Sequence, residues 1–224
     1  MGIEELKAPA PICVILGAGD ILDYAACAAR IPPPAFVICA DGGLRHCARL
    51  SISPDLLVGD FDSADPAMIP AGVPKVPLRP DKNHTDSFHA VEEAVARGYK
   101  SLRLCGMLGG RLDHTLANLQ LLAGCAVRGL GAAMTDGVTD IYPLAAGRGH
   151  TAELTLQPRR RHYFSLLSMV DACEAVTILG GVYPLDDYPL SSLEARAVSN
   201  EFADRPVRVL LRGGVLLVVV APME

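Results

Sequence analysis

The chain has 224 residues, of which half are hydrophobic, and its formal net charge is −5. This length is enough for one large domain or two modest ones with a buried core, and the composition excludes an intrinsically disordered chain. Because nucleic-acid binding needs clustered lysine and arginine, the charge argues against a nucleic-acid partner. The one basic run, Arg159 to Arg161, is short, and we expect it to form a solvated turn.

Short β-type runs alternate with helix-like segments over the first 140 residues. We expect strands near 12–19, 35–43, 55–62, 101–107 and 131–137, and helices near 21–30, 44–50, 85–99 and 113–124. In the last helix the spacing places Leu116, Leu119 and Leu122 or Ala123 inward. This alternation predicts an α/β domain, a doubly wound, mainly parallel sheet with helices on both faces.

The pattern changes after Pro143. The β-type runs 151–157, 163–169, 174–181, 195–202 and 207–220 are separated by turn residues and show almost no helical period. They predict a smaller C-terminal antiparallel β-sandwich. The stretch 140–148 is rich in glycine and proline, so we place the domain boundary there, giving residues 1–142 and 143–224.

The cysteines and the apolar runs indicate a cytoplasmic protein. The seven cysteines are odd in number and none has C-x-x-C spacing. Cys13 and Cys39 lie within apolar runs, where free thiols behave as small hydrophobes, so we expect no disulfide framework and no zinc site. The first ten residues lack the regions of a signal peptide, and the longest apolar run, Val215 to Ala221, is too short to span a bilayer. We therefore expect no membrane partner.

Acidic residues recur where the expected strands end or the following helices begin. These residues are Asp41, Asp60, Asp62, Asp81, Asp86 and Asp113. Ligands of an open parallel sheet bind outside the carboxyl ends of its strands. Carboxylates gathered there repel one another unless they share a cation, and Mg²⁺ takes one or two carboxylates together with substrate phosphates. In the stretch "GDFDS", Asp60 and Asp62 point the same way if the segment is extended, so this pair is predicted to be a magnesium cradle.

A plainer alternative exists for some of these acids. A single aspartate at a strand-to-helix junction is often only a helix N-cap, and Asp86 and Asp113 could each have that role. The pair at Asp60 and Asp62 is harder to explain in this way, because capping needs one acid and the second adds repulsion.

Three glycine-containing turns and two cations complete a possible phosphate site. The turns "GAGD" (17–20), "DGG" (41–43) and "GGRLD" (109–113) place small residues where helices begin, and backbone N–H groups there favour anions. Arg111 can pair bidentately with phosphate. Lys82 is a second candidate, although it could equally be a solvated loop residue. Of the nearby histidines, His84 could touch a ligand, whereas His89 and His114 are expected to be structural.

The motifs "ADGG", "VGDFDS", "DKNHTD" and "GGRLDH", in this order and spacing, resemble those of the thiamine pyrophosphokinase family. The later stretch "LGGVYPLDDYPLSSLEARAVSNEF" is similar to that family's segment that begins with G-x-x-[W/Y] and closes with Ser-Asn. The resemblance therefore covers most of the chain. Two departures stand out: Asn83 occupies a position where many relatives carry an acid, and Tyr183 stands where the family often has tryptophan.

The resemblance implies a fold, a reaction and a set of site residues. The fold is an α/β nucleotide-binding domain followed by a β-sandwich for thiamine binding and dimerisation, in a homodimer with its active sites at the subunit interface. The reaction moves the pyrophosphoryl group of ATP onto thiamine, giving thiamine diphosphate and AMP with Mg²⁺. Magnesium would be held by Asp60, Asp62 and Asp86. ATP and thiamine would be contacted by Asp41, Gly42, Gly43, Lys82, Arg111, Asp113, Tyr183, Ser199 and Asn200.

Two other functions are compatible with the same acids. A magnesium-dependent phosphohydrolase or another phosphotransferase would use water or a different alcohol as acceptor. A non-catalytic protein that binds nucleotide or thiamine diphosphate would bind its ligand without forming AMP.

Overall fold

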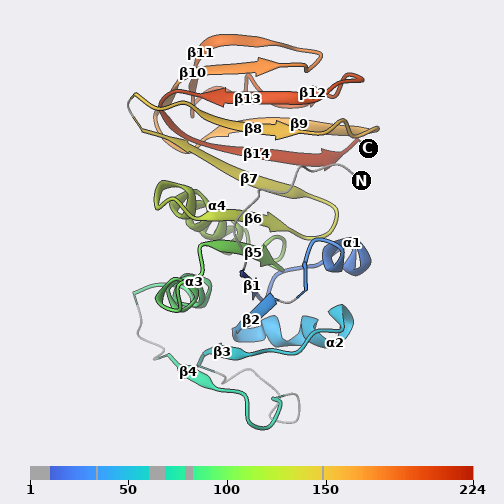
Figure 1. The fold of residues 1–224 in the computed structure, drawn as a ribbon, viewed down its shortest axis with the longest axis vertical. Helices are drawn as coiled ribbons and strands as arrows, with labels where there is room; N and C mark the ends of the chain where they lie inside the picture. Colours follow the sequence, from blue (N-terminus) through green and yellow to red (C-terminus); the bar gives the residue numbers. More distant parts are fainter. Residues whose placement is uncertain (1–10, 34, 61–68, 79–82, 148, 224) are drawn as a thin grey trace. The chain divides into compact units, whose positions relative to one another are not determined.

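A computed structural model describes residues 11–33, 35–60, 69–78, 83–147 and 149–223 (Figure 1). The chain separates into two compact units. Of the described residues, the α/β unit contains those from Pro11 to Leu121 together with Ala132–Val138, and the sandwich unit contains Leu122–Gly131 and those from Thr139 onwards. The boundary expected between residues 142 and 143 remains a prediction.

The α/β unit is built on a mainly parallel sheet. β1 pairs in parallel with β2 and β5, and β3 pairs in parallel with β2 and β4. β1 and β2 are nearly continuous apolar runs, as expected for strands that are covered on both faces. The strands follow the order β6-β5-β1-β2-β3-β4, with bounds β1 (Ile12–Leu16), β2 (Ala35–Ala40), β3 (Leu56–Gly59), β4 (Lys75–Pro77), β5 (Ser101–Cys105) and β6 (Gly131–Thr135).

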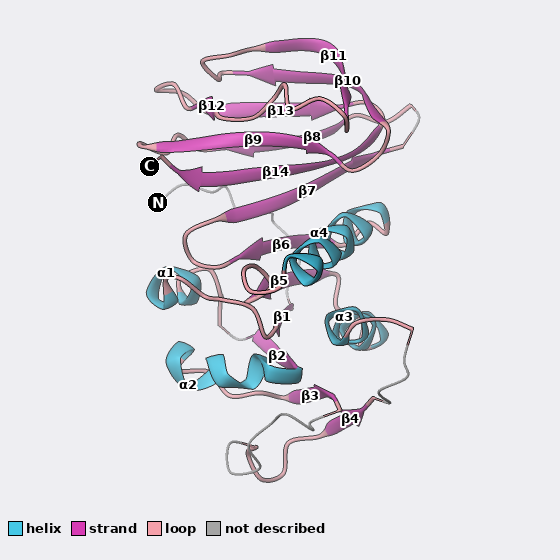
Figure 2. Ribbon diagram, turned by 180° about the vertical axis from the view of Figure 1, so that it is seen from behind, coloured by secondary structure: helices cyan, strands magenta, loops and turns pink. Residues whose placement is uncertain are grey.

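Helices cover both faces of this sheet. Two views from opposite sides place α1 and α2 on one face and α3 and α4 on the other (Figures 1 and 2). The predicted α/β fold is thus confirmed. The helices are α1 (Tyr24–Ala28), the 3-10 helix η1 (Asp41–His46), α2 (Cys47–Leu50), α3 (Asp86–Ala96) and α4 (Leu112–Val127).

The helix expected over 21–30 is shorter because its first residues are held elsewhere. The N–H groups of Leu22 and Asp23 donate to the Asp136 carbonyl at 2.8 and 3.2 Å, which keeps this segment extended. The Asp23 carboxylate then caps α1 by accepting the Ala26 N–H at 2.9 Å.

The inward face of α4 agrees only in part with the predicted one. Leu116 is 52% exposed, whereas Leu122 and Ala123 are buried. Asn118 lies inward and donates through Nδ2 to the Met107 carbonyl at 2.9 Å. A buried backbone carbonyl needs a hydrogen-bond donor, and Asn118 supplies it. A polar residue therefore occupies an inward position of α4 where the periodic pattern would place an apolar one.

The sandwich unit contains two four-stranded arrays. Strands β12-β9-β14-β7 follow one another in the first, and β11-β10-β13-β8 in the second, and neighbouring strands within each array are antiparallel. Their bounds are β7 (Asp140–Ala146), β8 (Ala152–Leu156), β9 (His162–Ser168), β10 (Ala172–Leu179), β11 (Leu185–Ser191), β12 (Asn200–Glu201), β13 (Val207–Leu211) and β14 (Gly214–Pro222).

Alternation along the strands builds the sandwich core. In β13, Val207, Val209 and Leu211 are fully buried, while Arg208 faces outward and forms a two-point ion pair with Glu153. Phe164 of β9 is likewise fully buried. This inward and outward alternation is the pattern of two sheets packed face to face, and it confirms the predicted β-sandwich.

Strand β7 and Arg159 differ from what the sequence predicted. β7 runs through the stretch in which the domain boundary was placed, and Pro143 is accommodated within it opposite Leu217 of β14. Arg160 and Arg161 are exposed in a turn, as expected, but Nη1 of Arg159 lies 2.8 Å from Oδ2 of Asp140, a carboxylate that is only 2% exposed. A buried carboxylate requires a partner, and the basic run supplies it.

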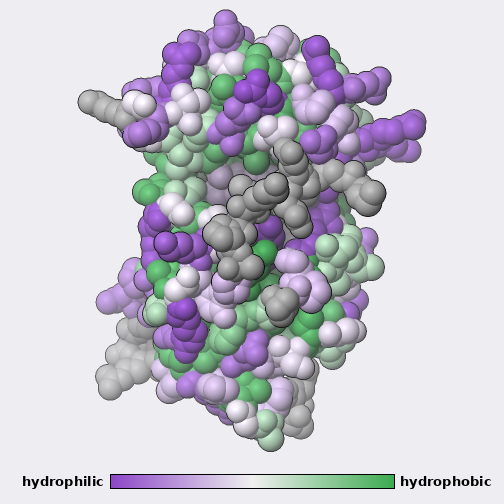
Figure 3. Space-filling view, viewed as in Figure 1, coloured by the Kyte–Doolittle hydropathy of each residue, from purple (hydrophilic) through white to green (hydrophobic). Residues whose placement is uncertain are grey.

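Hydrophilic and hydrophobic residues are interspersed over both units on the face shown in Figure 3. All seven cysteines are buried, and each is a thiol outside any disulfide. Within the described residues, no helix is both long and apolar enough to cross a membrane.

Gly43 is expected to tolerate no side chain. A Cβ there would lie 2.0 Å from the carbonyl oxygen of Leu16, a backbone atom that cannot rotate away. We expect Gly43→Ala to lower the free energy of unfolding by about 1–3 kcal/mol, as in other overpacked sites. Gly124→Ala in α4 is the control, because nothing lies within 4 Å of its added Cβ. There the unfolding free energy should rise by about 0.5–1 kcal/mol, since alanine favours a helix. Chemical denaturation measures both, and equal stabilities would contradict this packing.

Candidate nucleotide and metal site

Asp41 and Asp60 are brought together by the parallel strands β2 and β3. Asp41 directly follows β2 and Asp60 directly follows β3, and both are half-buried. A Cβ added to Gly59 would lie 3.2 Å from the Asp41 Cα, so the two strand ends are in contact. Asp41 has a left-handed backbone, with φ of 45°. A left-handed backbone is energetically unfavourable for residues other than glycine, and such residues occur most often at functional sites.

Asp86 is not the N-cap of its helix. Thr85 has that role, because its Oγ1 accepts the N–H of Phe88 at 3.2 Å. Asp86 is the first helical residue and is half-buried, at the end where the helix dipole favours a negative charge. The N-cap of α3 is therefore Thr85 and not Asp86.

Arg111 and Asp113 form a bidentate ion pair at the start of α4. Arg111 donates from Nε to Oδ1 at 3.1 Å and from Nη2 to Oδ2 at 2.6 Å. The side chains are 72% and 64% exposed. The guanidinium lowers the pKa of Asp113, and the carboxylate raises that of Arg111. The pair therefore presents a charged, solvent-accessible group with a fork geometry that also matches phosphate.

The "GAGD" turn has a different role from the predicted phosphate cradle. The N–H groups of Gly17 and Gly19 donate to the carbonyls of Cys105 and Gly106 at 2.9 and 2.7 Å. An added Cβ on Gly19 would lie 2.5 Å from the Leu108 carbonyl oxygen. These glycines allow the segments that follow β1 and β5 to pack closely against each other. Their N–H groups are already hydrogen-bonded to carbonyls of the neighbouring segment.

Three polar residues at this edge were missed from the sequence. Arg45 and His46 of η1 bind carbonyl oxygens of the loop after β1. Asp136, which follows β6, is 5% exposed and accepts the Val138 N–H at 2.8 Å. The position of Asp136 after a strand could have drawn attention to it. Nothing in the local pattern indicates the contacts of the other two.

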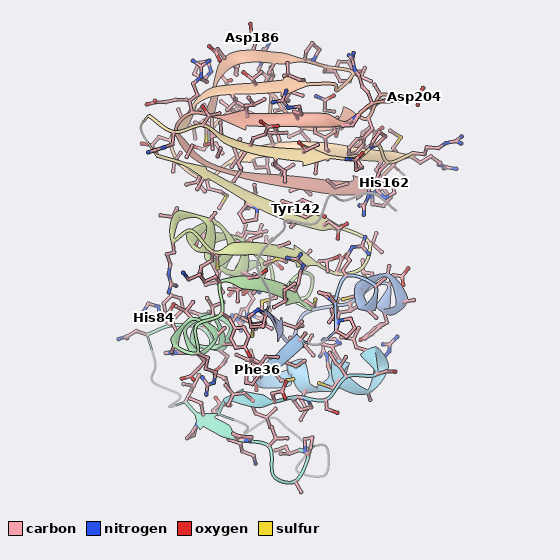
Figure 4. All side chains as sticks on the ribbon, in the orientation of Figure 1. Phe36, His84, Tyr142, His162, Asp186 and Asp204 are labelled. Atoms are coloured by element: carbon pink, nitrogen blue, oxygen red, sulfur yellow. The ribbon has the colours of Figure 1, made fainter. Side chains whose placement is uncertain are left out.

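Two predicted site residues, Asp62 and Lys82, lie outside the described residues, as does Asp81. Among the residues that the structure describes, no three His, Cys, Asp or Glu side chains are grouped closely enough to hold a metal ion. His84 projects from the beginning of α3 (Figure 4), and its ring stacks on Phe88 with centroids 4.2 Å apart.

The predicted thiamine-binding residues meet in the sandwich unit. Asn200, only 4% exposed, accepts the Tyr183 N–H through Oδ1 at 3.0 Å and donates from Nδ2 to the Tyr183 carbonyl at 2.6 Å. Ser199 is exposed and its N–H donates to Ser165 Oγ at 3.0 Å. The Tyr183 side chain is 59% exposed. Asn200 therefore holds the backbone that presents the tyrosine ring to solvent.

Two domain families match the chain. The model described as "Thiamin pyrophosphokinase, catalytic domain" matches residues 32–132. The model described as "Thiamin pyrophosphokinase, vitamin B1 binding domain" matches residues 150–216. The predicted boundary lies between the two matched ranges.

Full-length relatives agree with the domain matches. The thiamine pyrophosphokinase of Bacillus subtilis (strain 168) is 23% identical over 183 residues, which cover 80% of this chain and 84% of the relative. A crystal structure of the B. subtilis protein has a TM-score of 0.82 at 21% identity, covering 96% of this chain and all of that one. A yeast thiamin pyrophosphokinase structure has a TM-score of 0.72 at 13% identity, covering 96% and 87%.

The two domain matches together span most of the chain, in the order that the sequence motifs predict. The chain belongs to the thiamin pyrophosphokinase family.

Proposed function

We propose that the protein is a magnesium-dependent thiamine pyrophosphokinase that moves the pyrophosphoryl group of ATP onto the hydroxyl of thiamine. The observation that carries this proposal is the juxtaposition of Asp41 and Asp60 at the carboxyl edge of a parallel sheet, in a chain that belongs to this family. In the reaction, a bond forms between the thiamine oxygen and the β-phosphorus. The bond from that phosphorus to the α-phosphate oxygen breaks, AMP leaves, and the hydroxyl proton is lost.

The donor set at this edge fits magnesium. Asp60, which follows β3, and Asp86, in the first turn of α3, would supply oxygen ligands, and Asp62 is the proposed third. Mg²⁺ is commonly held by one or two carboxylates together with substrate phosphates and water, so a complete protein cage is not needed. When bound, the ion neutralises phosphate charge and aligns the reacting groups.

Arg111 and Asp113 would act on the nucleotide. The guanidinium already holds one planar anion, the Asp113 carboxylate, and its remaining N–H groups can donate to a phosphate oxygen. Asp41 would complete the acidic edge. Lys82 and the backbone of Gly42 and Gly43 are the other proposed nucleotide contacts.

The sandwich unit would bind thiamine. The exposed ring of Tyr183 suits a flat cationic ligand through stacking and cation–π attraction. Ser199 would supply a hydroxyl, and Asn200 would keep the Tyr183 loop in place. We further propose a homodimer in the cytoplasm, with the partner subunit completing each active site.

Thiamine-dependent AMP release tests the reaction and the acid set. Purified protein with ATP, Mg²⁺ and thiamine should form AMP and thiamine diphosphate together. Asp60→Asn and Asp86→Asn should each lower kcat by roughly a hundredfold or more, because loss of a group that stabilises developing charge costs that much. Asp204→Asn is the control, an exposed acid of the sandwich unit (Figure 4), and should retain wild-type kcat.

The outcomes of this assay separate the alternatives. ATP consumption without thiamine would favour a phosphohydrolase, and tight binding without AMP would favour a non-catalytic binder. If both variants still released AMP at the wild-type rate when thiamine is present, the proposed reaction would stand and the metal assignment would be overturned.

Asn200 is expected to affect thiamine selectively. Asn200→Ala removes both hydrogen bonds to the Tyr183 backbone, so the KM for thiamine should rise about tenfold while the KM for ATP stays unchanged. Stability should also fall by about 1–3 kcal/mol, since buried polar groups lose their partner. Asn118→Ala, which removes a comparable amide-to-carbonyl bond from α4 to Met107, should lose stability without a change in thiamine KM. A thiamine KM that responds equally in the two variants would contradict the assignment.

A further inference from the structure

Side chains from α1 and η1 hold the loop that follows β1. Arg45 donates from Nη2 to the carbonyl oxygens of Ala18 and Gly19 at 2.6 and 2.9 Å. Nε2 of His46 lies 3.0 Å from the same Gly19 oxygen, and the Tyr24 hydroxyl lies 2.7 Å from Nδ1 of His46. We call Tyr24, Arg45 and His46 the loop clamp.

The contacts of His46 fix its chemical state. A carbonyl oxygen can only accept, so Nε2 carries a proton and donates to Gly19. In the neutral ring Nδ1 is then an acceptor, and the Tyr24 hydroxyl donates to it. Burial and the nearby Arg45 guanidinium lower the pKa of His46, which favours this neutral form. His46 is only 2% exposed. The guanidinium of Arg49 stacks over the Tyr24 ring, with its Cζ 3.6 Å from the ring centroid.

The clamped loop is bonded to the segment that leads to Arg111. The N–H of Gly19 donates to the Gly106 carbonyl at 2.7 Å, and the N–H of the next residue donates to the Leu108 carbonyl at 2.7 Å. A Cβ on Gly106 would come within 3.0 Å of His46 Nε2, so the ring also abuts this segment. Because η1 begins at Asp41, the clamp connects the segment of Asp41 to that of Arg111.

We propose that His46 is a positioning residue for nucleotide binding, which acts by fixing the Gly19 carbonyl and thereby the spacing of segments 41–43 and 106–111. This inference rests on the proposed function. His46 contacts no reacting atom, and its effect is transmitted through the two interlocked loops. The competing view is that His46 only stabilises the fold, and kinetics can separate the two.

Steady-state kinetics of His46→Leu, His46→Gln and Tyr24→Phe test the proposal. Leucine removes both polar contacts, glutamine keeps a donor that can reach Gly19, and phenylalanine removes only the hydroxyl. We expect the KM for ATP to rise between about ten- and a hundredfold in His46→Leu, since small misplacements have costs of this size. The rise should be much smaller in His46→Gln, with kcat and the KM for thiamine near wild type. An unchanged KM for ATP, or a parallel rise for both substrates, would overturn the positioning role.

Amide hydrogen exchange tests the clamp without any activity. We expect faster exchange at Gly19 and at residues 106–113 in His46→Leu, partial protection in Tyr24→Phe and near-normal protection in His46→Gln. The exposed His150→Leu serves as the control, with an unchanged pattern. If the wild-type protein formed no AMP, the proposed function would fail while this experiment still judged the clamp. Unaltered exchange in both His46→Leu and Tyr24→Phe would overturn the clamp itself.

Discussion

Parallel pairing is the constraint on which the proposed site depends. Because β1, β2, β3 and β5 run in the same direction, the residues that follow them emerge at one edge of the sheet. The chain segments that leave this edge must pass one another closely, and glycine makes that possible. Gly43 passes the carbonyl of Leu16, and Gly19 passes that of Leu108, at distances that a side chain would not allow. The same pairing therefore sets both the close backbone contacts and the gathering of acids.

The electrostatics of this edge follow from its geometry. Asp41 and Asp60 lie at the ends of neighbouring strands that contact each other. Two carboxylates so placed repel one another in the absence of a cation. Two cationic side chains nearby have other partners: Arg111 binds Asp113, and Arg45 binds backbone carbonyls. In the proposed reaction, the acids that follow β2 and β3 would face a metal ion bound together with substrate phosphates.

Periodicity predicted most of the fold, and the misses have physical causes. The apolar runs predicted β1, β2, β3, β5 and β6, and the helical period predicted α3. Leu116 was placed inward by spacing alone, but the need of the Met107 carbonyl for a donor places Asn118 there. Strand β7 was not predicted because it contains Pro143. Proline lacks a backbone N–H donor, but the strand forms despite it. The Arg159–Asp140 pair joins residues far apart in sequence, and no local pattern indicates it.

The candidate site was predictable only in part, for a similar reason. Acids at strand ends are visible in sequence because the chain direction fixes where they emerge. The clamp on Gly19 is not visible, since it depends on contacts between residues more than twenty positions apart. The glycines of "GAGD" suggested phosphate binding, whereas in the structure they allow close backbone packing. The sequence alone does not show whether a backbone N–H group is already hydrogen-bonded within the protein.

In the proposed reaction, Asp60 and Asp86 would hold a magnesium ion against the nucleotide. A crystal structure of the protein with Mg²⁺, thiamine and a non-transferable ATP analogue would show whether they do. We expect an ion with carboxylate oxygens of both residues among its ligands, at about 2.0–2.1 Å, and with the remaining positions filled by phosphate oxygens and water. An ion bound to the phosphates alone, or to carboxylates elsewhere in the chain, would overturn this metal assignment.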